Sequence, residues 1–441
     1  MLKHLLKSNA AVAACSVMTL AAATLAFADT AGPVKFSFSS AGAPGYVQVA
    51  PTAQYSDTTG YGFEPGSKVT IVDRGGSEAL RSGYVTSDHP FFFSVKVPEG
   101  NYRITLTLGD SNGESVTTVK TELRRLALEQ AHTSAGEIIS PVITANVRQP
   151  RIPGGGAVKL KGRETSKNPG GEWAEWDDKL TFEFSDKHPA LCALSIEKAD
   201  ELPTVYLCGD STVCDQPSEP FNSWGQMLPR WFKGDVVIAN QAESGETLGG
   251  FYAEGRIDKI MSTLKKGDYV FVQFGHNDMK AGANEPPEKY KAFYARLVGE
   301  TIAKGATPVI LTPVSRKSFN ANGQITNSFK EFPDKVRELA KEQDVAFIDL
   351  QNISARFYEA LGKANITPVF ANAREGTHHS DYGSYEIAKC VVQGIIDDKL
   401  PLAASVVDDW KPFDPSHPDL LANFTLPPDP SNRNVATPLG N

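Results

Sequence analysis

The sequence predicts an α/β domain with a parallel sheet covered on both faces, preceded by a domain made mainly of strands. Over residues 203–402, short apolar, β-prone runs alternate with helical patterns, which is typical of parallel strands joined by helical crossovers. Over residues 29–202, short strand-like runs are separated by Gly, Pro, Asp and Asn, which is typical of a β-sandwich. We therefore expect two folded domains with these bounds.

The first 28 residues have the pattern of a cleaved export signal. Lys3 and Lys7 give a positive start, a mainly apolar run follows over 10–26, and Ala26-Phe27-Ala28 offers small residues at a cleavage point. A retained membrane anchor is the alternative, but the uninterrupted run is shorter than the roughly 20 apolar residues that a spanning helix needs. We expect a mature protein exported to the periplasm or the extracellular space.

The charge balance argues against two classes of partner. The formal net charge is −8, and losing Lys3 and Lys7 with the leader would take it to −10. An acidic chain repels nucleic acid and anionic lipid, so we expect neither nucleic-acid binding nor membrane binding after signal cleavage. The oligomeric state stays open.

The cysteines outside the leader lack the spacing of metal ligands: Cys192, Cys208, Cys214 and Cys390. Cys208 and Cys214 flank a serine turn, where an exported protein could join them in a disulfide or keep both as buried thiols. The sequence also has no HExxH pattern, no carboxylate cluster and no Gly-rich phosphate loop. We expect no metal and no cofactor.

In the first domain, runs rich in β-branched and aromatic residues predict strands at 68–72, 91–97, 102–108 and 179–184. Trp173 and Trp176 could stack on sugars, although such tryptophans more often pack against a core or a neighbouring domain. The domain is therefore expected either to bind glycan or to form one wall of a neighbouring cleft.

In the second domain, the alternating pattern predicts strands at 205–208, 235–240, 269–274, 307–311 and 345–349. It predicts helices at 223–232, 257–264, 290–304, 332–343 and 382–397, the first shortened by Pro229. The Pro-rich tail at 403–441 is expected to run as extended chain, either docked through Trp410, Phe413 and Phe424 or partly disordered.

Four loops of the second domain carry polar residues with catalytic potential: 209–211, 240–245, 275–278 and 375–378. Each of the first three directly follows a predicted strand. Parallel strands present their carboxyl ends at one edge of the sheet, where ligands bind in open α/β folds. We therefore expect these loops to lie together.

The residue types in these loops suit acyl transfer, which needs a nucleophile, a base and donors for an oxyanion. Ser211 is the candidate nucleophile and His378 the candidate base. The candidate oxyanion donors are the N–H of Ser211, an N–H at Gly245 and the side-chain amide of Asn277. Each residue alone has an ordinary explanation as a cap, a turn former or a loop histidine. Their combination favours catalysis.

Three further polar residues in these loops are expected to support the site rather than react: Asp210, His276 and Asp278. The two aspartates can accept backbone N–H groups and hold their loops, and His276 could line a pocket for the acyl group.

The four loops, in register, resemble the motif blocks of the SGNH (GDSL-type) hydrolases over residues 205–388. Gly-Asp-Ser-Thr at 209–212 and Trp-Gly-Gln at 224–226 are most similar to the rhamnogalacturonan acetylesterases. This resemblance implies a three-layer, flavodoxin-like hydrolase domain and metal-independent ester hydrolysis. Residues 43–46 and 60–64 resemble, less specifically, an accessory β domain of some bacterial members, for which a galactose-binding-like fold is one option.

One departure from that family pattern concerns the residue that orients the base. The family places an Asp three residues before its histidine, where this sequence has Glu375. Either Glu375 holds His378 with a carboxylate one methylene further out, or a backbone carbonyl does so. His379 is a rival base, but its partner position would be Gly376, so His378 is favoured.

We therefore expect an exported serine esterase that removes acetyl groups from a plant cell-wall polysaccharide, most simply pectic rhamnogalacturonan, through an acetyl-enzyme. One alternative is an esterase for xylan or for a small acyl ester. Another is a catalytically impaired carbohydrate-binding protein on a hydrolase scaffold, with Glu375 as the sign of lost activity.

Overall fold

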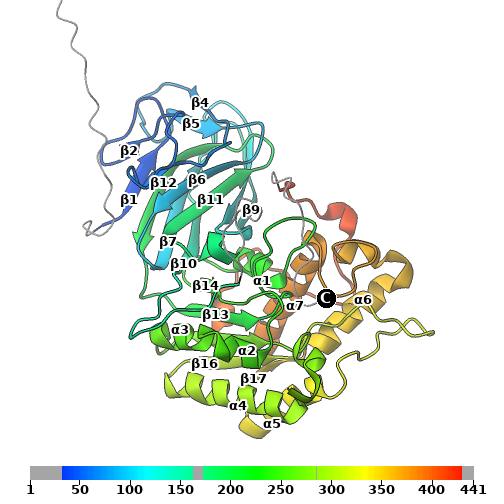
Figure 1. Cartoon of the computed structure of the whole chain (residues 1–441). Helices are drawn as coiled ribbons and strands as arrows, with labels where there is room; N and C mark the ends of the chain where they lie inside the picture. The colour runs from blue at the N-terminus through cyan, green and yellow to red at the C-terminus, as the bar shows by residue number, and fades with distance from the viewer. Residues whose placement is uncertain (1–31, 162–171, 285, 430–441) are drawn as a thin grey trace, which may run out of the picture.

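The computed structural model describes residues 32–161, 172–284 and 286–429. The expected leader at 1–28 and the end of the tail at 430–441 lie outside these ranges. Figure 1 shows a strand-rich unit, coloured blue to green, against a unit of alternating strands and helices, coloured green to orange. Of the helices in the described ranges, none combines the length and the apolar character needed to cross a bilayer.

The second unit is built on one parallel sheet with the strand order β14-β13-β15-β16-β17. Its strands are β13 (Thr204–Gly209), β14 (Val237–Asn240), β15 (Tyr269–Gln273), β16 (Thr307–Leu311) and β17 (Ala346–Ile348). In chain order this is 2-1-3-4-5, the flavodoxin-like arrangement, whose ligand site lies where the order reverses between the first and third strands. The predicted fold class is confirmed, and the reversal falls between β13 and β15.

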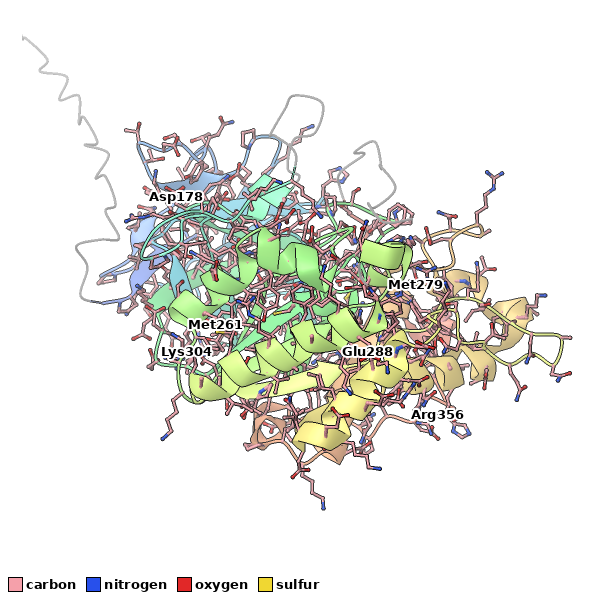
Figure 2. The ribbon with its side chains drawn as sticks, turned by 60° about the horizontal axis from the view of Figure 1, so that its bottom comes forward. Asp178, Met261, Met279, Glu288, Lys304 and Arg356 are labelled. Atoms are coloured by element: carbon pink, nitrogen blue, oxygen red, sulfur yellow. The ribbon has the colours of Figure 1, made fainter. Side chains whose placement is uncertain are left out.

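Helices cover both faces of this sheet. Side chains alternate between faces along a strand, so Val205 and Leu207 of β13 enter one core while Tyr206 and Cys208 enter the other. The first core is closed by α1 (Trp224–Met227), α6 (Leu350–Asn365) and α7 (Asp381–Asp397). The second is closed by α2 (Leu248–Ala253), α3 (Arg256–Thr263), α4 (Pro287–Ala303) and α5 (Phe332–Gln343). Figure 2 looks onto this second helical layer, where α4 runs between the labelled Glu288 and Lys304 and α3 carries Met261.

Several helices differ from the sequence expectation. The helix expected at 223–232 is α for only one turn and continues as a 3-10 helix, since Pro229 cannot donate a backbone hydrogen bond. Helices α2 and α6 were not predicted. Helix α2 was missed because it contains Gly249 and Gly250, which are weak helix formers. Its N-cap is Thr247, whose hydroxyl accepts the Gly250 N–H at 2.9 Å. The 3-10 helices are η2 (Glu172–Glu175), η3 (Leu228–Trp231), η4 (Asp278–Lys280), η5 (Gly282–Asn284), η6 (Thr367–Val369), η7 (Pro401–Ser405) and η8 (Leu421–Asn423).

The first unit is a sandwich of two sheets. One contains β1 (Val34–Ser37), β2 (Val47–Gln48), β4 (Thr70–Asp73), β5 (Gly83–Thr86), β7 (Gly100–Leu108), β10 (Val142–Val147) and β12 (Leu191–Lys198). The other contains β3 (Tyr61–Phe63), β6 (Phe91–Lys96), β8 (Ser115–Thr121), β9 (Arg125–Thr133) and β11 (Lys179–Ser185). The predicted runs correspond to β4, β6, β7 and β11. The inner faces meet in an aromatic core, where Phe36 and Phe93 pack edge to face with ring centroids 5.3 Å apart.

The two units share part of their interior. Leu126 of β9 is fully buried in the same core as α1 and α7. The Asn101 amide donates to the Thr204 hydroxyl at 2.8 Å, which joins β7 to the start of β13. Because β9 lies against α1 and η3, the strand-rich unit reaches close to the loop that follows β13.

The described part of the tail docks on the same core. Phe413 is buried, and Trp410 packs edge to face on Trp231 with ring centroids 5.1 Å apart. Phe424 lies against Tyr385 at 5.1 Å. Of the two alternatives for the tail, docking therefore describes residues 403–429.

Candidate active site

The turn after β13 holds Ser211 at the carboxyl edge of the sheet. The N–H groups of Val213 and Cys214 donate to the Asp210 carbonyl at 2.9 and 3.0 Å, which closes the turn. A Cβ at Gly209 would lie 2.4 Å from the Val213 side chain and 2.9 Å from the Gln273 carbonyl. The tight strand-to-turn geometry therefore requires glycine before Asp210.

Ser211 and His378 are brought together from the two ends of the domain. The Ser211 Oγ lies 2.7 Å from the His378 Nε2, and each residue is only 1% exposed. The edge of the Phe221 ring packs on the imidazole with centroids 5.9 Å apart. This is the contact that a serine nucleophile and its general base require.

The loop before His378 places Glu375 behind the imidazole. The Glu375 Oε2 lies 3.4 Å from the His378 Nδ1, on the side of the ring away from Ser211. Its Oε1 accepts the N–H groups of Gly376, Thr377 and His378 at 2.9, 2.8 and 3.2 Å. The His378 Nδ1 has no hydrogen-bond partner among the described residues, whether carboxylate or backbone carbonyl, and Glu375 reaches it only at ion-pair distance. Of the two expectations for the orienting group, this proximity favours the carboxylate of Glu375.

The rival base His379 has different surroundings. Its Nε2 lies 2.6 Å from the Tyr358 hydroxyl, and its ring stacks on Phe370 with centroids 5.2 Å apart. Burial, with nearby His378 and His276, lowers the pKa of His379 to about 3. His379 is therefore a neutral core histidine, and the structure brings His378 to Ser211.

The expected oxyanion donors lie on loops that are tied to the serine turn. Gly245 adopts a positive φ of 75° in the loop after β14. That loop is joined to β13 by the Glu243 N–H, which donates to the Gly209 carbonyl at 3.1 Å. The Asn277 amide donates to the Glu246 carbonyl at 3.0 Å. A side-chain amide carries two hydrogens, so Asn277 retains one for an oxyanion.

Asp210, His276 and Asp278 connect these loops, as expected of supporting residues. The Asp210 Oδ1 accepts the N–H and the hydroxyl of Thr212 at 2.9 and 2.8 Å, and its Oδ2 lies 3.2 Å from the His276 Nδ1. The Asp278 Oδ1 accepts the Leu248 N–H at 2.9 Å. Burial raises the pKa of Asp210, but His276 and the Thr212 bonds outweigh it and leave that pKa below its usual range.

His276 is packed against Asp210 and Phe329, and its expected place in the wall of an acyl pocket stays a prediction. The ring is buried, with Nδ1 on Asp210 and its edge on Phe329 at a centroid distance of 4.9 Å. Burial lowers the pKa of His276, although Asp210 opposes that shift. A neutral His276 that donates through Nδ1 joins the β13 and β15 loops.

The structure decides the state of the cysteines and describes one of the two tryptophans considered for sugar stacking. Cys192, Cys208, Cys214 and Cys390 are buried free thiols, so Cys208 and Cys214 do not form a disulfide. Trp176 is 3% exposed and lies beneath the guanidinium of Arg148 at 4.8 Å, which leaves no face for a sugar. The side chain of Trp173 lies outside the described residues. In the described ranges no group of three or more His, Cys, Asp or Glu side chains could hold a metal ion.

Sequence reasoning missed the arginines that the strand-rich unit contributes behind the serine turn. Arg124 donates to the carbonyls of Gln216 and Phe221 at 3.2 and 2.9 Å. Gln216 in turn donates to the Ser211 carbonyl at 2.7 Å. Two consecutive arginines in a β-rich stretch match no motif that would predict this contact. The contact depends on how the turn between β8 and β9 packs against the second domain.

The neighbouring Arg125 anchors the same turn through a buried ion pair. Its Nε donates to the Asp215 Oδ2 at 2.6 Å, and its Nη2 to the Glu175 Oε2 at 3.3 Å. The Asp215 Oδ1 accepts from the Asn240 amide at 2.8 Å, and that amide also donates to the Val213 carbonyl. The ends of β13 and β14 are thus held by a residue of the other domain.

Two family models match this chain. The GDSL-like lipase/acylhydrolase family matches residues 207–384. A domain described as β-agarase/YXIM esterase-like, galactose-binding domain-like, matches residues 34–125. The first match spans the Ser211, Gly245, Asn277 and His378 loops, and the second lies within the β-sandwich.

Curated relatives give the same picture. Rhamnogalacturonan acetylesterase RhgT of Bacillus subtilis (strain 168) is 36% identical over 217 residues, 46% of this chain and 94% of the relative. The uncharacterized esterase YxiM of the same organism is 26% identical over 369 residues, 79% of this chain and 87% of the relative. A crystal structure of YxiM from Bacillus subtilis superposes with a TM-score of 0.46 at 23% identity, covering 84% of this chain and 99% of that one.

Proposed function

This chain belongs to the GDSL-like lipase/acylhydrolase family and is an SGNH-type carbohydrate acetylesterase, and from that premise we propose that its substrate is acetylated pectic rhamnogalacturonan. The observation that carries the chemistry is the 2.7 Å contact between the Ser211 Oγ and the His378 Nε2, with Glu375 behind the imidazole. The choice of polymer rests on the relatives RhgT and YesY, which are named a rhamnogalacturonan acetylesterase and a probable one.

The first half of the reaction transfers the acetyl group to the enzyme. The Ser211 Oγ attacks the acetyl carbonyl carbon while the His378 Nε2 accepts the hydroxyl proton. The resulting oxyanion is stabilised by the N–H groups of Ser211 and Gly245 and by the Asn277 amide. The carbon–oxygen bond to the sugar then breaks, and the sugar oxygen receives the proton from Nε2.

The second half regenerates the serine. A water molecule attacks the acetyl-enzyme, and its proton passes to the His378 Nε2. The ester bond to the Ser211 Oγ breaks, the oxygen recovers the proton, and acetate leaves. Glu375 stabilises the imidazolium in both halves by facing its Nδ1.

Acetate release from polymers tests this proposal. Wild type, Ser211→Ala and a control variant are compared on acetylated rhamnogalacturonan and acetylated xylan. The control is Ser262→Ala, which alters a serine of α3 whose hydroxyl donates to the Lys259 carbonyl of the same helix. We expect release from rhamnogalacturonan by wild type and Ser262→Ala, and its loss in Ser211→Ala. Preferential release of acetate from xylan would identify acetylated xylan as the substrate instead. Release of acetate by the Ser211→Ala variant would overturn the mechanism. If wild type releases acetate from neither polymer and from no small acetyl ester, the carbohydrate-binding alternative is favoured.

We also propose that the protein is exported, with cleavage after Ala28. The charged start and the apolar run over 10–26 support this. Intact-mass measurement of the protein purified from the cell envelope and the medium tests it: a mass that begins at Asp29 is expected. A full-length chain that remains inside the cell would exclude export.

A further inference from the structure

Three basic residues are anchored to the loops that carry the reaction centre. The Arg316 Nη2 donates to the His276 carbonyl at 3.1 Å. The Lys317 N–H donates to the carbonyl of Gly376, between Glu375 and His378, at 2.9 Å. The Lys280 N–H donates to the Asn277 carbonyl at 2.9 Å. Each residue is therefore tied, by its backbone or its side chain, to a loop with a proposed catalytic or supporting group; we call Lys280, Arg316 and Lys317 the cationic rim.

The cationic rim is not engaged in close ion pairs in the part of the chain that the structure describes. Within the described residues, Lys280, Arg316 and Lys317 have no ion pair at 4.0 Å or less, although many basic residues elsewhere are paired. The Arg316 Nε is buried and has no hydrogen-bond partner. A half-buried guanidinium without an ion-pair partner gains free energy when an anion reaches its exposed part.

The rim is held in place by contacts that leave its charge available. Arg316 lies over the face of Phe329 at 5.4 Å, and Lys317 lies over Phe370 at 5.1 Å while its Nζ donates to the Ala373 carbonyl at 3.1 Å. Both are half-buried, and Lys280 is exposed. Burial lowers the pKa of each of the three; Asp210 and Glu375 oppose that shift at Lys280 and Arg316, and Glu375 opposes it at Lys317. Aromatic faces orient the cations without neutralising them.

The rim contrasts with the chain as a whole, whose formal net charge is −8. A polyanionic substrate would be repelled by such a protein unless cations were placed where it binds. A guanidinium matches the two oxygens of a carboxylate, and lysines add point charges beside it.

We propose that Lys280, Arg316 and Lys317 bind carboxylates of uronate units next to the acetylated sugar, so that the esterase selects an acidic glycan over a neutral one. The inference deepens the proposed function and rests on it. It assigns substrate selection to the residues that flank Ser211 and His378, rather than to the β-sandwich.

A binding measurement tests the rim without turnover. Ser211→Ala protein is titrated with acetylated rhamnogalacturonan oligosaccharide, either with free carboxylates or with every carboxylate methyl-esterified. We expect the free acid to bind about tenfold more tightly than the methyl ester. This difference should shrink in about 0.5 M salt, because ions at that concentration screen charge interactions strongly. In the Ser211→Ala background, Arg316→Gln and Lys317→Gln should each remove most of the difference. Lys363→Gln, an exposed lysine on α6, should preserve it.

The outcomes separate the two proposals. Equal affinity for the acid and its methyl ester, or a preference that survives in the Arg316→Gln, Lys317→Gln double variant, would overturn the cationic rim. The rim variants could remove the preference for the free acid while wild type releases no acetate from the same oligosaccharide. This pair of results would overturn the proposed function and leave the proposal of carboxylate binding intact.

Discussion

The carboxylate of Glu375 turns back on its own loop, so that its Oε2 lies 3.4 Å from the His378 Nδ1 while its Oε1 accepts three successive backbone N–H groups. The extra methylene of Glu relative to Asp is accommodated by this folded conformation. The three N–H bonds fix the carboxylate on its own loop, so one side chain both closes the loop and faces the imidazole.

The first prediction concerns the charge of Glu375. Glu375→Gln should lower kcat by about 10²–10⁴-fold with little change in KM, because an amide can donate to Nδ1 and favour the wrong tautomer. Glu375→Asp keeps the charge and should lower kcat by about tenfold or less. The shorter side chain cannot both accept the three backbone N–H groups and reach the His378 Nδ1. Steady-state kinetics of acetate release measures both. A Gln variant as active as the Asp variant would assign orientation of His378 to another group.

The second prediction concerns the amide of Asn277. Asn277→Ala should lower kcat by about 10²–10³-fold, equivalent to about 2.7–4 kcal/mol of transition-state stabilisation. The residue also donates to the Glu246 carbonyl, so thermal unfolding is measured on the same samples. A folded Ala variant that keeps kcat near the wild-type value would exclude Asn277 as an oxyanion donor.

The third prediction concerns the buried ion pair between the two domains. Arg125→Met leaves the buried Asp215 and Glu175 with only the Arg148 guanidinium, whose Nη2 lies 2.5 Å from the Glu175 Oε2 and 4.0 Å from the Asp215 Oδ2. Because one guanidinium then serves two carboxylates, the change should lower the free energy of unfolding by about 3 kcal/mol. Lys96→Met removes an ion pair to Asp178 whose side chains are 41% and 39% exposed, and should cost about 1 kcal/mol or less. Urea unfolding midpoints compare the two variants. Similar small losses would show that Arg125 does not stabilise the domain contact.

The fourth prediction concerns acid stability. The folded pKa of His379 is about 3, below that of an unfolded histidine, so protons bind the unfolded chain preferentially as pH falls from about 6.5 towards 3. Stability is therefore present above that window and is lost on acidification through it. His379→Gln should reduce the loss of unfolding free energy between pH 7 and pH 5 by about 2 kcal/mol.

Denaturant unfolding at the two pH values measures this effect. His417→Gln is the control, because that ring is 83% exposed, and its loss between pH 7 and pH 5 should match that of wild type. An unchanged pH dependence in His379→Gln would mean that His379 is charged in the folded state.

The sequence by itself determined the fold class and the four loops of the site. Strands such as 269–273 and 307–311 are apolar apart from Gln273 and Thr307 at their ends, which indicates a parallel sheet covered on both faces. Polar residues that directly follow such strands must share one edge of the sheet, so Ser211 and Asn277 could be expected together before any coordinates. Where a strand ends depends mainly on the residues next to it, so the local sequence is enough to predict which polar residues follow the strand.

Tertiary structure decided what depends on contacts between distant segments. His378 and His379 are neighbours in the chain, yet one meets Ser211 and the other meets Tyr358, because the approach to α7 turns their side chains to different surroundings. Strand β8 and the turn carrying Arg124 contain polar residues that resemble an exposed surface until the two domains pack. Burial and charge pairing are properties of the assembled fold, since each requires a partner that sequence spacing does not specify.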